Sequence, residues 1–82
     1  MSQQQIAQWL REHLASLLKL DLAQVDSALA FDEYGVASRD AVGMIGELGQ
    51  WLERELDPAL VYDYPSIDEL SNHLSTLTRA EP

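Results

Sequence analysis

Apolar residues recur at three- and four-residue steps along much of the chain, which is the spacing of one buried face on an α-helix. In residues 3–19 the stripe consists of Ile6, Trp9, Leu10, Leu14, Leu17 and Leu18. A second stripe consists of Ala41, Val42, Ile45, Leu48, Leu52 and Leu56. The pattern predicts a first helix over residues 3–19 and a second helix that starts at Ser38 or Arg39 and continues for about five turns.

Two further helices are predicted near the C-terminus. Asp57-Pro58 is typical of an N-cap followed by proline at the first helical position, which predicts a short helix over residues 58–62. Ser66 and Glu69 fit a capping box at the start of a last helix that ends near Thr76. The inward face of that helix is expected to contain Leu70, Leu74 and Leu77.

The connection over residues 20–37 is long for a structureless loop. Its apolar residues Val25, Leu29 and Phe31 are expected to hold it across the helices, with a short helical turn inside it. The fold class is therefore predicted to be all-α: a small four-helix bundle with a long loop between helices 1 and 2 and a short helix 3. We expect one domain over residues 1–82, with residues 1–4 and 79–82 frayed.

Three glycines lie within the second predicted helix at three-residue spacing. Gly43, Gly46 and Gly49 each lower helix stability by roughly 1 kcal/mol relative to alanine. Such a smooth strip allows close packing against a neighbouring helix of the same domain. It equally allows a partner protein or a pendant chain to approach the backbone.

Composition narrows the functional classes. The chain has 82 residues, a net charge of −9 and no cysteine. The charge would repel nucleic acids and anionic lipids, so neither is an expected partner, whereas it suits fast, transient docking onto basic protein surfaces. Without a signal peptide pattern or a bilayer-spanning run, we expect a soluble, cytoplasmic protein. We also expect it to be a monomer.

Ser38 is the main candidate for chemistry. It lies between a turn containing Gly35 and the first turn of a predicted helix, where unpaired N–H groups and the helix dipole favour an anionic group. A phosphodiester attached to the hydroxyl would suit this position. Taken alone, the pattern equally describes an ordinary N-cap serine, which is the more common role.

Structural roles are expected for the other notable residues. His13 and His73 lie on separate predicted helices without a second ligand at four-residue spacing, so neither metal binding nor acid–base catalysis is expected. Trp9 and Trp51 are expected to pack in the core. The acidic pairs Asp32/Glu33 and Glu53/Glu55 are expected to be solvated charges.

With these residues laid out, the chain resembles an acyl carrier protein domain of the polyketide synthase type, which is a phosphopantetheine-binding carrier. The matching segments are Phe31-Asp32-Glu33-Tyr34-Gly35-Val36 before Ser38, Ala41-Val42 after it, and Leu60-Val61-Tyr62-Asp63-Tyr64-Pro65-Ser66-Ile67. The resemblance implies that Ser38 carries 4′-phosphopantetheine, attached by a phosphopantetheinyl transferase, and that acyl groups are held as thioesters on its thiol. It implies a non-catalytic carrier that serves polyketide synthase or fatty-acid enzymes.

The segment 38–48, with Trp51-Leu52 and Asp57-Pro58-Ala59-Leu60, is more narrowly similar to carriers found beside fatty-acyl-AMP ligases. One departure concerns Ala37, since that family usually has aspartate immediately before the modified serine. The missing carboxylate is expected to weaken contacts with the transferase or its metal. Arg39 also replaces the apolar residue that commonly follows the serine.

The docking surface for partner enzymes is expected to include or adjoin Arg39, Met44, Glu47 and Val61. For Met44 and Val61 the alternative is packing in the core. Two other functional classes stay open: an acidic helical docking module without a prosthetic group, and a small hydrolase that uses Ser38. The hydrolase is disfavoured because neither histidine has a sequence context that indicates a general base.

Overall fold

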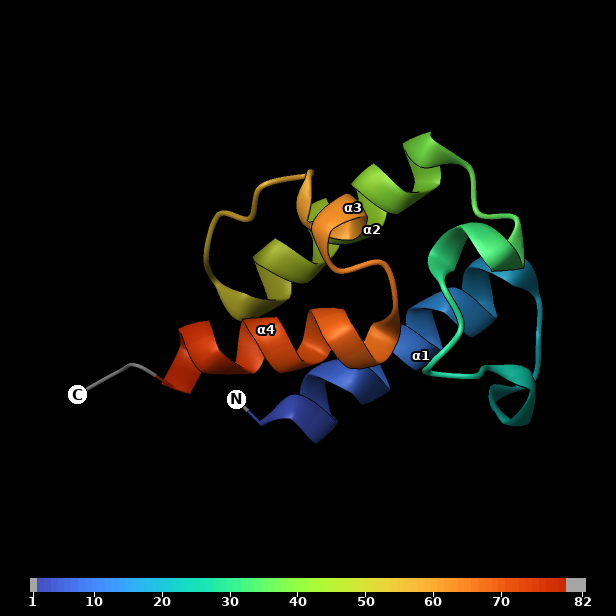
Figure 1. The fold of residues 1–82 in the computed structure, drawn as a ribbon, viewed down its shortest axis with the longest axis horizontal. Coiled ribbons are helices and arrows are strands. Elements are labelled where there is room, and N and C mark those ends of the chain that lie inside the picture. The colour runs from blue at the N-terminus through green and yellow to red at the C-terminus, as the bar shows by residue number, and fades with distance from the viewer. Residues whose placement is uncertain (1, 80–82) are drawn as a thin grey trace.

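A computed structural model describes residues 2–79, and Met1 and residues 80–82 lie outside the described part. Its α-helices are α1 (Gln3–Leu18), α2 (Ser38–Leu52), α3 (Leu60–Asp63) and α4 (Ile67–Arg79). Helices α1 and α4 pack side by side, and α3 packs against α2 (Figure 1). The predicted all-α bundle, with a long first loop and a short third helix, is confirmed.

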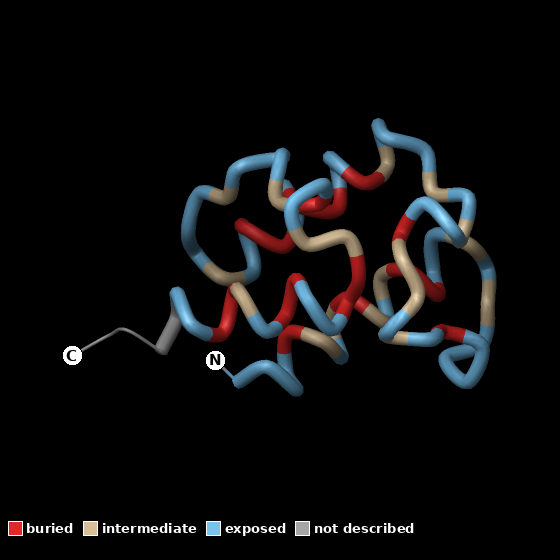
Figure 2. The backbone as a smooth tube through the Cα atoms, in the orientation of Figure 1, coloured by how far each residue is buried: buried red, intermediate tan, exposed pale blue. Residues whose placement is uncertain are grey.

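The core is built from the apolar stripes that the sequence predicts, and buried segments from all the long helices face one another (Figure 2). Its fully buried large side chains include Ile6, Leu10, Leu14, Met44, Ile45, Leu48, Ile67, Leu70 and Leu74. The predicted burial is wrong for three residues of these stripes: Leu17, Val42 and Leu77 are 36–40 % exposed. The buried face of α2 instead includes Met44, which is 1 % exposed.

Both long N-terminal helices end at a residue with left-handed backbone geometry. Lys19 and Glu53 each have φ of 57°. After α2, the Arg54 N–H donates to the Gly49 carbonyl at 3.0 Å, and the Glu53 N–H donates to the Gln50 carbonyl at 3.2 Å, which is a Schellman arrangement. The predicted continuation of the second helix to Leu56 is therefore wrong, because the chain reverses at Glu53.

The short helix and the last helix also differ from prediction at their ends. The Asp57 carboxylate accepts from the Ala59 N–H at 2.9 Å, so Asp57 shapes a turn and the helix begins at Leu60, two residues later than predicted. In contrast, Ser66 caps α4 as predicted, since its hydroxyl accepts from the Glu69 N–H at 3.2 Å. Helix α4 continues to Arg79 rather than ending near Thr76.

Helical geometry extends into both end segments that the sequence predicts to fray. At the N-terminus, the Ser2 hydroxyl accepts from the Gln5 N–H at 3.2 Å, and the Gln5 side chain accepts from the Ser2 N–H at 2.9 Å. This capping box starts α1 at Gln3. At the other end, helix α4 includes Arg79, while the remaining residues of the tail lie outside the described part.

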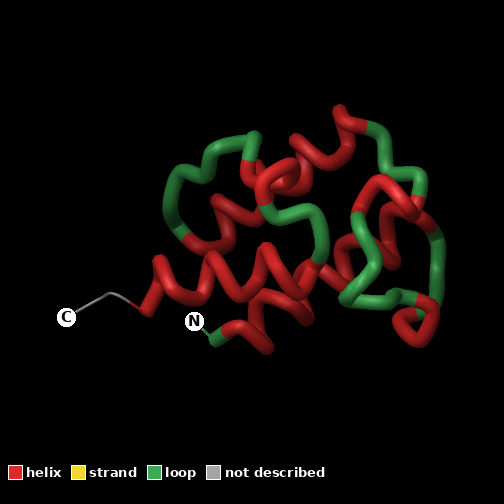
Figure 3. Tube along the Cα trace, in the orientation of Figure 1, coloured by secondary structure: helices red, strands yellow, loops and turns green. Residues whose placement is uncertain are grey.

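The long connection lies across the bundle, as predicted, and contains two 3₁₀ turns, η1 (Leu22–Gln24) and η2 (Phe31–Tyr34) (Figure 3). Val25 and Phe31 are buried and Leu29 is half-buried. The connection is also held by backbone bonds to the start of α4: the Phe31 N–H donates to the Pro65 carbonyl at 2.7 Å, and the Asp68 N–H donates to the Ser27 carbonyl at 3.0 Å.

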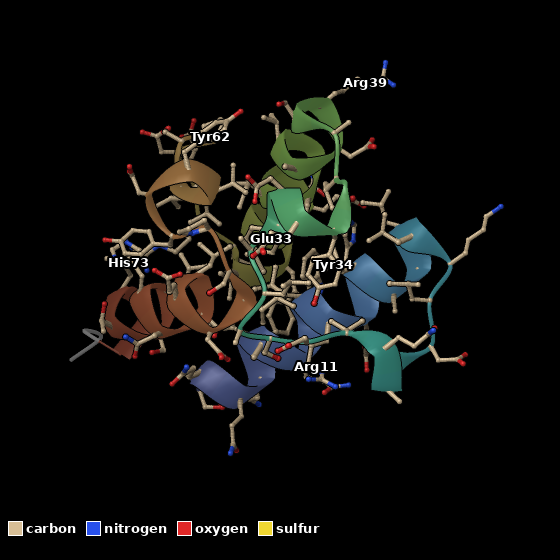
Figure 4. The ribbon with its side chains drawn as sticks, turned by 45° about the vertical axis from the view of Figure 1, so that its right-hand side comes forward. Arg11, Glu33, Tyr34, Arg39, Tyr62 and His73 are labelled. Atoms are coloured by element: carbon tan, nitrogen blue, oxygen red, sulfur yellow. The ribbon has the colours of Figure 1, made fainter. Side chains whose placement is uncertain are left out.

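Tyr34 and Arg11 fasten the connection to itself and to α1 (Figure 4). The Tyr34 hydroxyl accepts from the Asp26 N–H at 2.6 Å and donates to the Asp26 carbonyl. The Arg11 guanidinium donates to the Ser27 hydroxyl at 3.0 Å and to the Leu22 carbonyl at 3.2 Å. These bonds give the segment that leads to Ser38 a defined path.

A pH-dependent loss of stability is expected from Tyr34. Partial burial and the nearby Asp26 charge raise the pKa of Tyr34 above its ordinary 10.0, against the opposing effects of the Asp26 N–H and Arg11. Its stabilising contribution is therefore complete below pH 10.0 and is lost as the pH rises through the folded-state pKa. In urea titrations between neutral and strongly alkaline pH, the free energy of unfolding should fall more steeply for the wild type than for Tyr34→Phe. Equal slopes would contradict this assignment.

The three glycines of α2 have different surroundings. A Cβ atom built on Gly43 or Gly46 meets no atom within 4 Å, whereas one built on Gly49 lies 2.8 Å from the Arg54 carbonyl oxygen. Gly49 is therefore closely packed inside the domain, but against Arg54 and Leu56 of the loop after α2 and not against a neighbouring helix, as one of the two alternatives expected. At Gly43 and Gly46 the backbone of α2 is open to approach from outside.

Candidate functional site

Ser38 lies where η2 turns into α2, at one end of the bundle. Gly35 ends η2 with φ of 82°, a left-handed conformation that glycine adopts without strain. Val36 then packs against the core while Ala37 and Ser38 are exposed. The chain thus delivers Ser38 to the surface as the first residue of α2, as predicted.

Ser38 is not the N-cap residue. That position is Ala37, which has no side-chain hydrogen bond to the helix. The first N–H groups of α2 have no intrahelical acceptor, and no capping side chain occupies them, so the positive end of the helix dipole is accessible beside the Ser38 hydroxyl. The interpretation of Ser38 as an ordinary capping serine is therefore wrong.

The other serines differ from Ser38 in exposure or in hydrogen bonding. Ser66, Ser71 and Ser75 are at most 3 % exposed, and the Ser27 hydroxyl accepts a hydrogen bond from Arg11. Within the described residues, Ser16 and Ser38 are the exposed serines whose hydroxyls have no hydrogen-bond partner. Ser16 lies near the end of α1, where no free helix N–H groups are available to an attached anion.

A cavity of about 230 Å³ opens beside Ser38, between η2, α2 and α3. Phe31, Ala41 and Val61 line it with apolar groups, and Asp32 and Tyr62 are exposed at its rim. Tyr62 is 65 % exposed and lies on α3 (Figure 4). The site therefore combines an accessible hydroxyl, free backbone N–H groups and an adjacent apolar surface.

Of the four expected docking residues, two are on the surface. Arg39 extends into solvent at the start of α2 (Figure 4), and the Glu47 side chain is 63 % exposed. Met44 and Val61 are 1 % and 5 % exposed, so the core alternative holds for both. Val61 nevertheless lines the cavity beside Ser38.

Both histidines have packing partners away from Ser38. His13 stacks on Trp9 at 5.0 Å between ring centroids and lies 3.6 Å from the Glu47 carboxylate. His73 stacks on Tyr64 at 4.1 Å. The described residues contain no group of three or more His, Asp or Glu side chains that could hold a metal ion. None of the described helices combines the length and the apolar character needed to cross a bilayer.

Sequence reasoning missed the cavity and misplaced Trp51. The cavity forms where α3 and the residue after it meet η2 and the start of α2, which lie much earlier in the chain, so no local pattern could predict it. The expectation of Trp51 in the core is wrong, because its side chain is 38 % exposed. Trp9 does pack against the core, as expected.

An all-α bundle that presents a free serine hydroxyl at a helix start, beside an apolar groove, has the architecture of a carrier domain. Residues 8–74 match the protein family described as "Phosphopantetheine attachment site". The chain belongs to this family: it is a carrier domain of the polyketide synthase type, and its cofactor is 4′-phosphopantetheine.

Relatives and solved structures agree with this assignment. The chain is 34 % identical over 67 residues to a phenolphthiocerol/phthiocerol polyketide synthase of Mycobacterium tuberculosis, and the match covers 82 % of the chain but only 4 % of that protein. It is 30 % identical over 46 residues to "Acyl carrier protein TtuC" of Teredinibacter turnerae, covering 56 % of the chain and 53 % of that protein.

Among solved structures, an acyl carrier protein from Anabaena sp. PCC 7120 has a TM-score of 0.89 and 35 % identity, with 95 % of this chain and 89 % of that chain covered. It is described as having a variant phosphopantetheinylation-site sequence. A free-standing peptidyl carrier protein from Acinetobacter baumannii has a TM-score of 0.86 and 26 % identity, with 93 % and 95 % of the two chains covered.

Proposed function

We propose that Ser38 is the residue to which 4′-phosphopantetheine is attached. The observation that carries this proposal is the position of its hydroxyl, which is exposed, without a hydrogen-bond partner among the described residues, and at the first residue of α2. The free N–H groups of the first turn and the helix dipole would stabilise the attached phosphodiester. Once attached, the cofactor supplies a thiol on a flexible arm, which this cysteine-free chain lacks.

The role of the chain itself is to present the attached group to partner enzymes. The core holds α2 rigidly, so Ser38 stays at the surface, and a flexible tether there raises the effective concentration of an attached group at any enzyme that docks. The Ser38 hydroxyl donates no hydrogen bond to either histidine, so neither is placed as a general base, which disfavours the hydrolase alternative. We therefore propose delivery of acyl groups to polyketide or fatty-acid biosynthetic enzymes as the function of this domain.

The direct test is to incubate the purified chain with coenzyme A and a broad-specificity phosphopantetheinyl transferase. Intact-protein mass spectrometry should show one phosphopantetheine increment, and peptide mapping should place it on the peptide that contains Ser38. An unmodified chain after complete modification of a control carrier would contradict the proposal, as would an increment on Ser16.

We further propose that the exposed face of α2 is the docking surface for these enzymes. Arg39, Gly43 and Glu47 follow one another at four-residue spacing and line a groove of about 260 Å³ between α1 and α2. Arg39 makes no hydrogen bond or ion pair within the described part of the chain, so its charge is free for a partner. The open backbone at Gly43 and Gly46 supports close approach at the same face.

The loading enzyme is proposed to be a fatty-acyl-AMP ligase, on the resemblance of segment 38–48 to carriers paired with such ligases. Incubation of the modified protein with such a ligase, ATP and a fatty acid should add one acyl mass.

A monomeric, cytoplasmic carrier is consistent with the net charge of −9 and the lack of cysteine, because self-repulsion opposes association and no disulfide is needed.

Ala37 provides a prediction about the modification rate. The similar protein from Anabaena is itself described as an acyl carrier protein with a variant phosphopantetheinylation-site sequence, so a departure from the usual sequence at the attachment site is compatible with a carrier role. Ala37→Asp should raise the free energy of unfolding by about 1 kcal/mol, because the carboxylate would cap α2. It should also speed modification about threefold by restoring an acidic contact to the transferase.

Ala37→Asn is the matched control, since asparagine caps a helix as well as aspartate but carries no charge. Both variants should show the same increase in the midpoint of thermal unfolding, and only Ala37→Asp should show faster modification in a time course of mass spectra. Equal rates for the two variants would mean that the negative charge at residue 37 does not matter to the transferase.

A further inference from the structure

An exposed aromatic surface lies on α1 and α2, at the end of α2 opposite to Ser38. Trp51 follows Ser38 by thirteen residues in the same helix, which separates the two by about 20 Å along the axis. It is 38 % exposed, although large aromatic side chains are normally buried far more completely. It continues the four-residue spacing of Arg39, Gly43 and Glu47 at the far end of α2, beyond the groove that those three residues line.

Trp51 is held in place by a stack of three rings. The Trp9 ring stacks with two others: His13, at 5.0 Å and 11°, and Trp51, at 5.8 Å and 20°. His13 is in turn close to the Glu47 carboxylate, at 3.6 Å. The nearly parallel contact with Trp9 fixes the orientation of the Trp51 ring.

A groove of about 460 Å³ runs beside this stack along the polar side of α1. Both indoles line it, together with Gln5, Gln8 and Glu12. The Gln8 amide donates to the exposed Glu12 carboxylate at 2.8 Å, which positions that charge at the groove. None of the described residues that line the groove is basic. We call Trp9, Trp51 and Glu12 the indole surface.

We propose that the indole surface docks an arginine side chain of a partner protein. A planar guanidinium stacks on an aromatic face and can at the same time pair with a carboxylate, which a lysine ammonium does less well. A fixed, exposed tryptophan and a partner arginine are residue types that dominate binding energy at protein interfaces. The net charge of −9 favours approach of a basic partner. This docking is independent of the arm at Ser38.

The test uses the full chain, labelled with ¹⁵N, and follows the indole N–H resonances of Trp9 and Trp51. The probe is the capped dipeptide of two arginines, and its control is the dipeptide of two citrullines, which has a similar shape without charge. The Trp51 resonance should shift with a slope about threefold or more steeper for the arginine peptide, because the guanidinium charge drives the contact. The backbone amide resonance of Tyr62, an exposed aromatic residue elsewhere, should give no such difference.

Variants assign the effect to named groups. Glu12→Gln, at an exposed position, should reduce the slope at Trp51 by about half or more, as expected for loss of an exposed ion pair. Trp51→Phe keeps a ring in the stack and should retain part of the shift of the Trp9 indole resonance. Trp51→Leu should remove that shift. Tyr62→Leu should leave the slope at Trp51 unchanged. Modification at Ser38 should proceed at the wild-type rate in the Trp51 variants, which separates this proposal from the function proposed above.

Three results would overturn the proposal. One is equal slopes for the arginine and citrulline peptides. The second is a response that spreads over acidic surface residues and is unaffected by Glu12→Gln or Trp51→Leu, which would be unspecific charge attraction. The third is a shift of the Trp51 resonance with protein concentration in the absence of peptide, which would assign the surface to a second copy of the chain.

Discussion

Replacing Ser38 with alanine is expected to abolish phosphopantetheine attachment completely while leaving the fold intact. The hydroxyl is the acceptor in the proposed transfer, and alanine offers no group in its place. The folded state should hardly change, because Ser38 is exposed and makes no hydrogen bond within the described residues. Surface substitutions of this kind usually alter the free energy of unfolding by less than about 0.5 kcal/mol.

The measurement is the intact mass after exhaustive incubation with transferase and coenzyme A, with thermal unfolding recorded in parallel. Ser16→Ala is the matched control, since Ser16 is an exposed serine without a hydrogen bond in the described part of the chain. It should keep the full increment. If the mass increment is still present in Ser38→Ala, the cofactor is attached to another residue. Partner binding unaffected by Ser38→Ala, in a protein never modified, would instead favour a docking module without a prosthetic group.

The helices of this fold are predictable from sequence because each buries one stripe of apolar residues. The stripe on α1, with Ile6, Leu10 and Leu14 fully buried, has the helical period. The capping serine of α4 is predictable too, because its hydrogen bond depends on a local pattern of Ser66 and Glu69. Local sequence patterns therefore predict the helices and most of the residues at which they begin.

Helix ends are less predictable because they depend on backbone geometry that the residue types do not favour. A left-handed residue after a helix is usually glycine, yet α1 and α2 end at Lys19 and Glu53. Since Leu52 and Leu56 keep the helical spacing, the sequence pattern continues past the point where the chain turns. The packing of Leu56 near Gly49, at 3.5 Å from a Cβ built there, indicates why the turn occurs at this place.

The candidate site likewise has some features that local sequence patterns predict and others that depend on long-range contacts. The accessible serine at the start of α2 follows from Gly35 and the apolar stripe behind it, both of which are local signals. The cavity beside it and the burial of Met44 and Val61 depend on how α2 and α3 meet, which requires long-range contacts. The exposure of Trp51 similarly depends on a ring stack between two helices.

Opposite changes in stability are expected when the glycines of α2 are replaced by alanine. Gly43→Ala and Gly46→Ala should each raise the free energy of unfolding by about 1 kcal/mol, because alanine is the better helix former and its Cβ meets no atom within 4 Å. Gly49→Ala should lower it by about 1 kcal/mol, since overpacking by roughly 1–3 kcal/mol exceeds the same gain in helix propensity. Its Cβ would lie 2.8 Å from the Arg54 carbonyl oxygen, which is backbone and cannot rotate away.

For a domain of this size, a change of about 1 kcal/mol moves the midpoint of thermal unfolding by roughly 4–8 °C, so calorimetry can resolve the three single variants. Gly43 and Gly46 serve as each other's control, because both lie on the open face and neither touches the end of α2. A stabilised Gly49→Ala variant would mean that the turn at Glu53 yields easily. If Gly46→Ala is more stable yet is acylated more slowly after modification, the open backbone of α2 is retained for partner docking at the expense of helix stability.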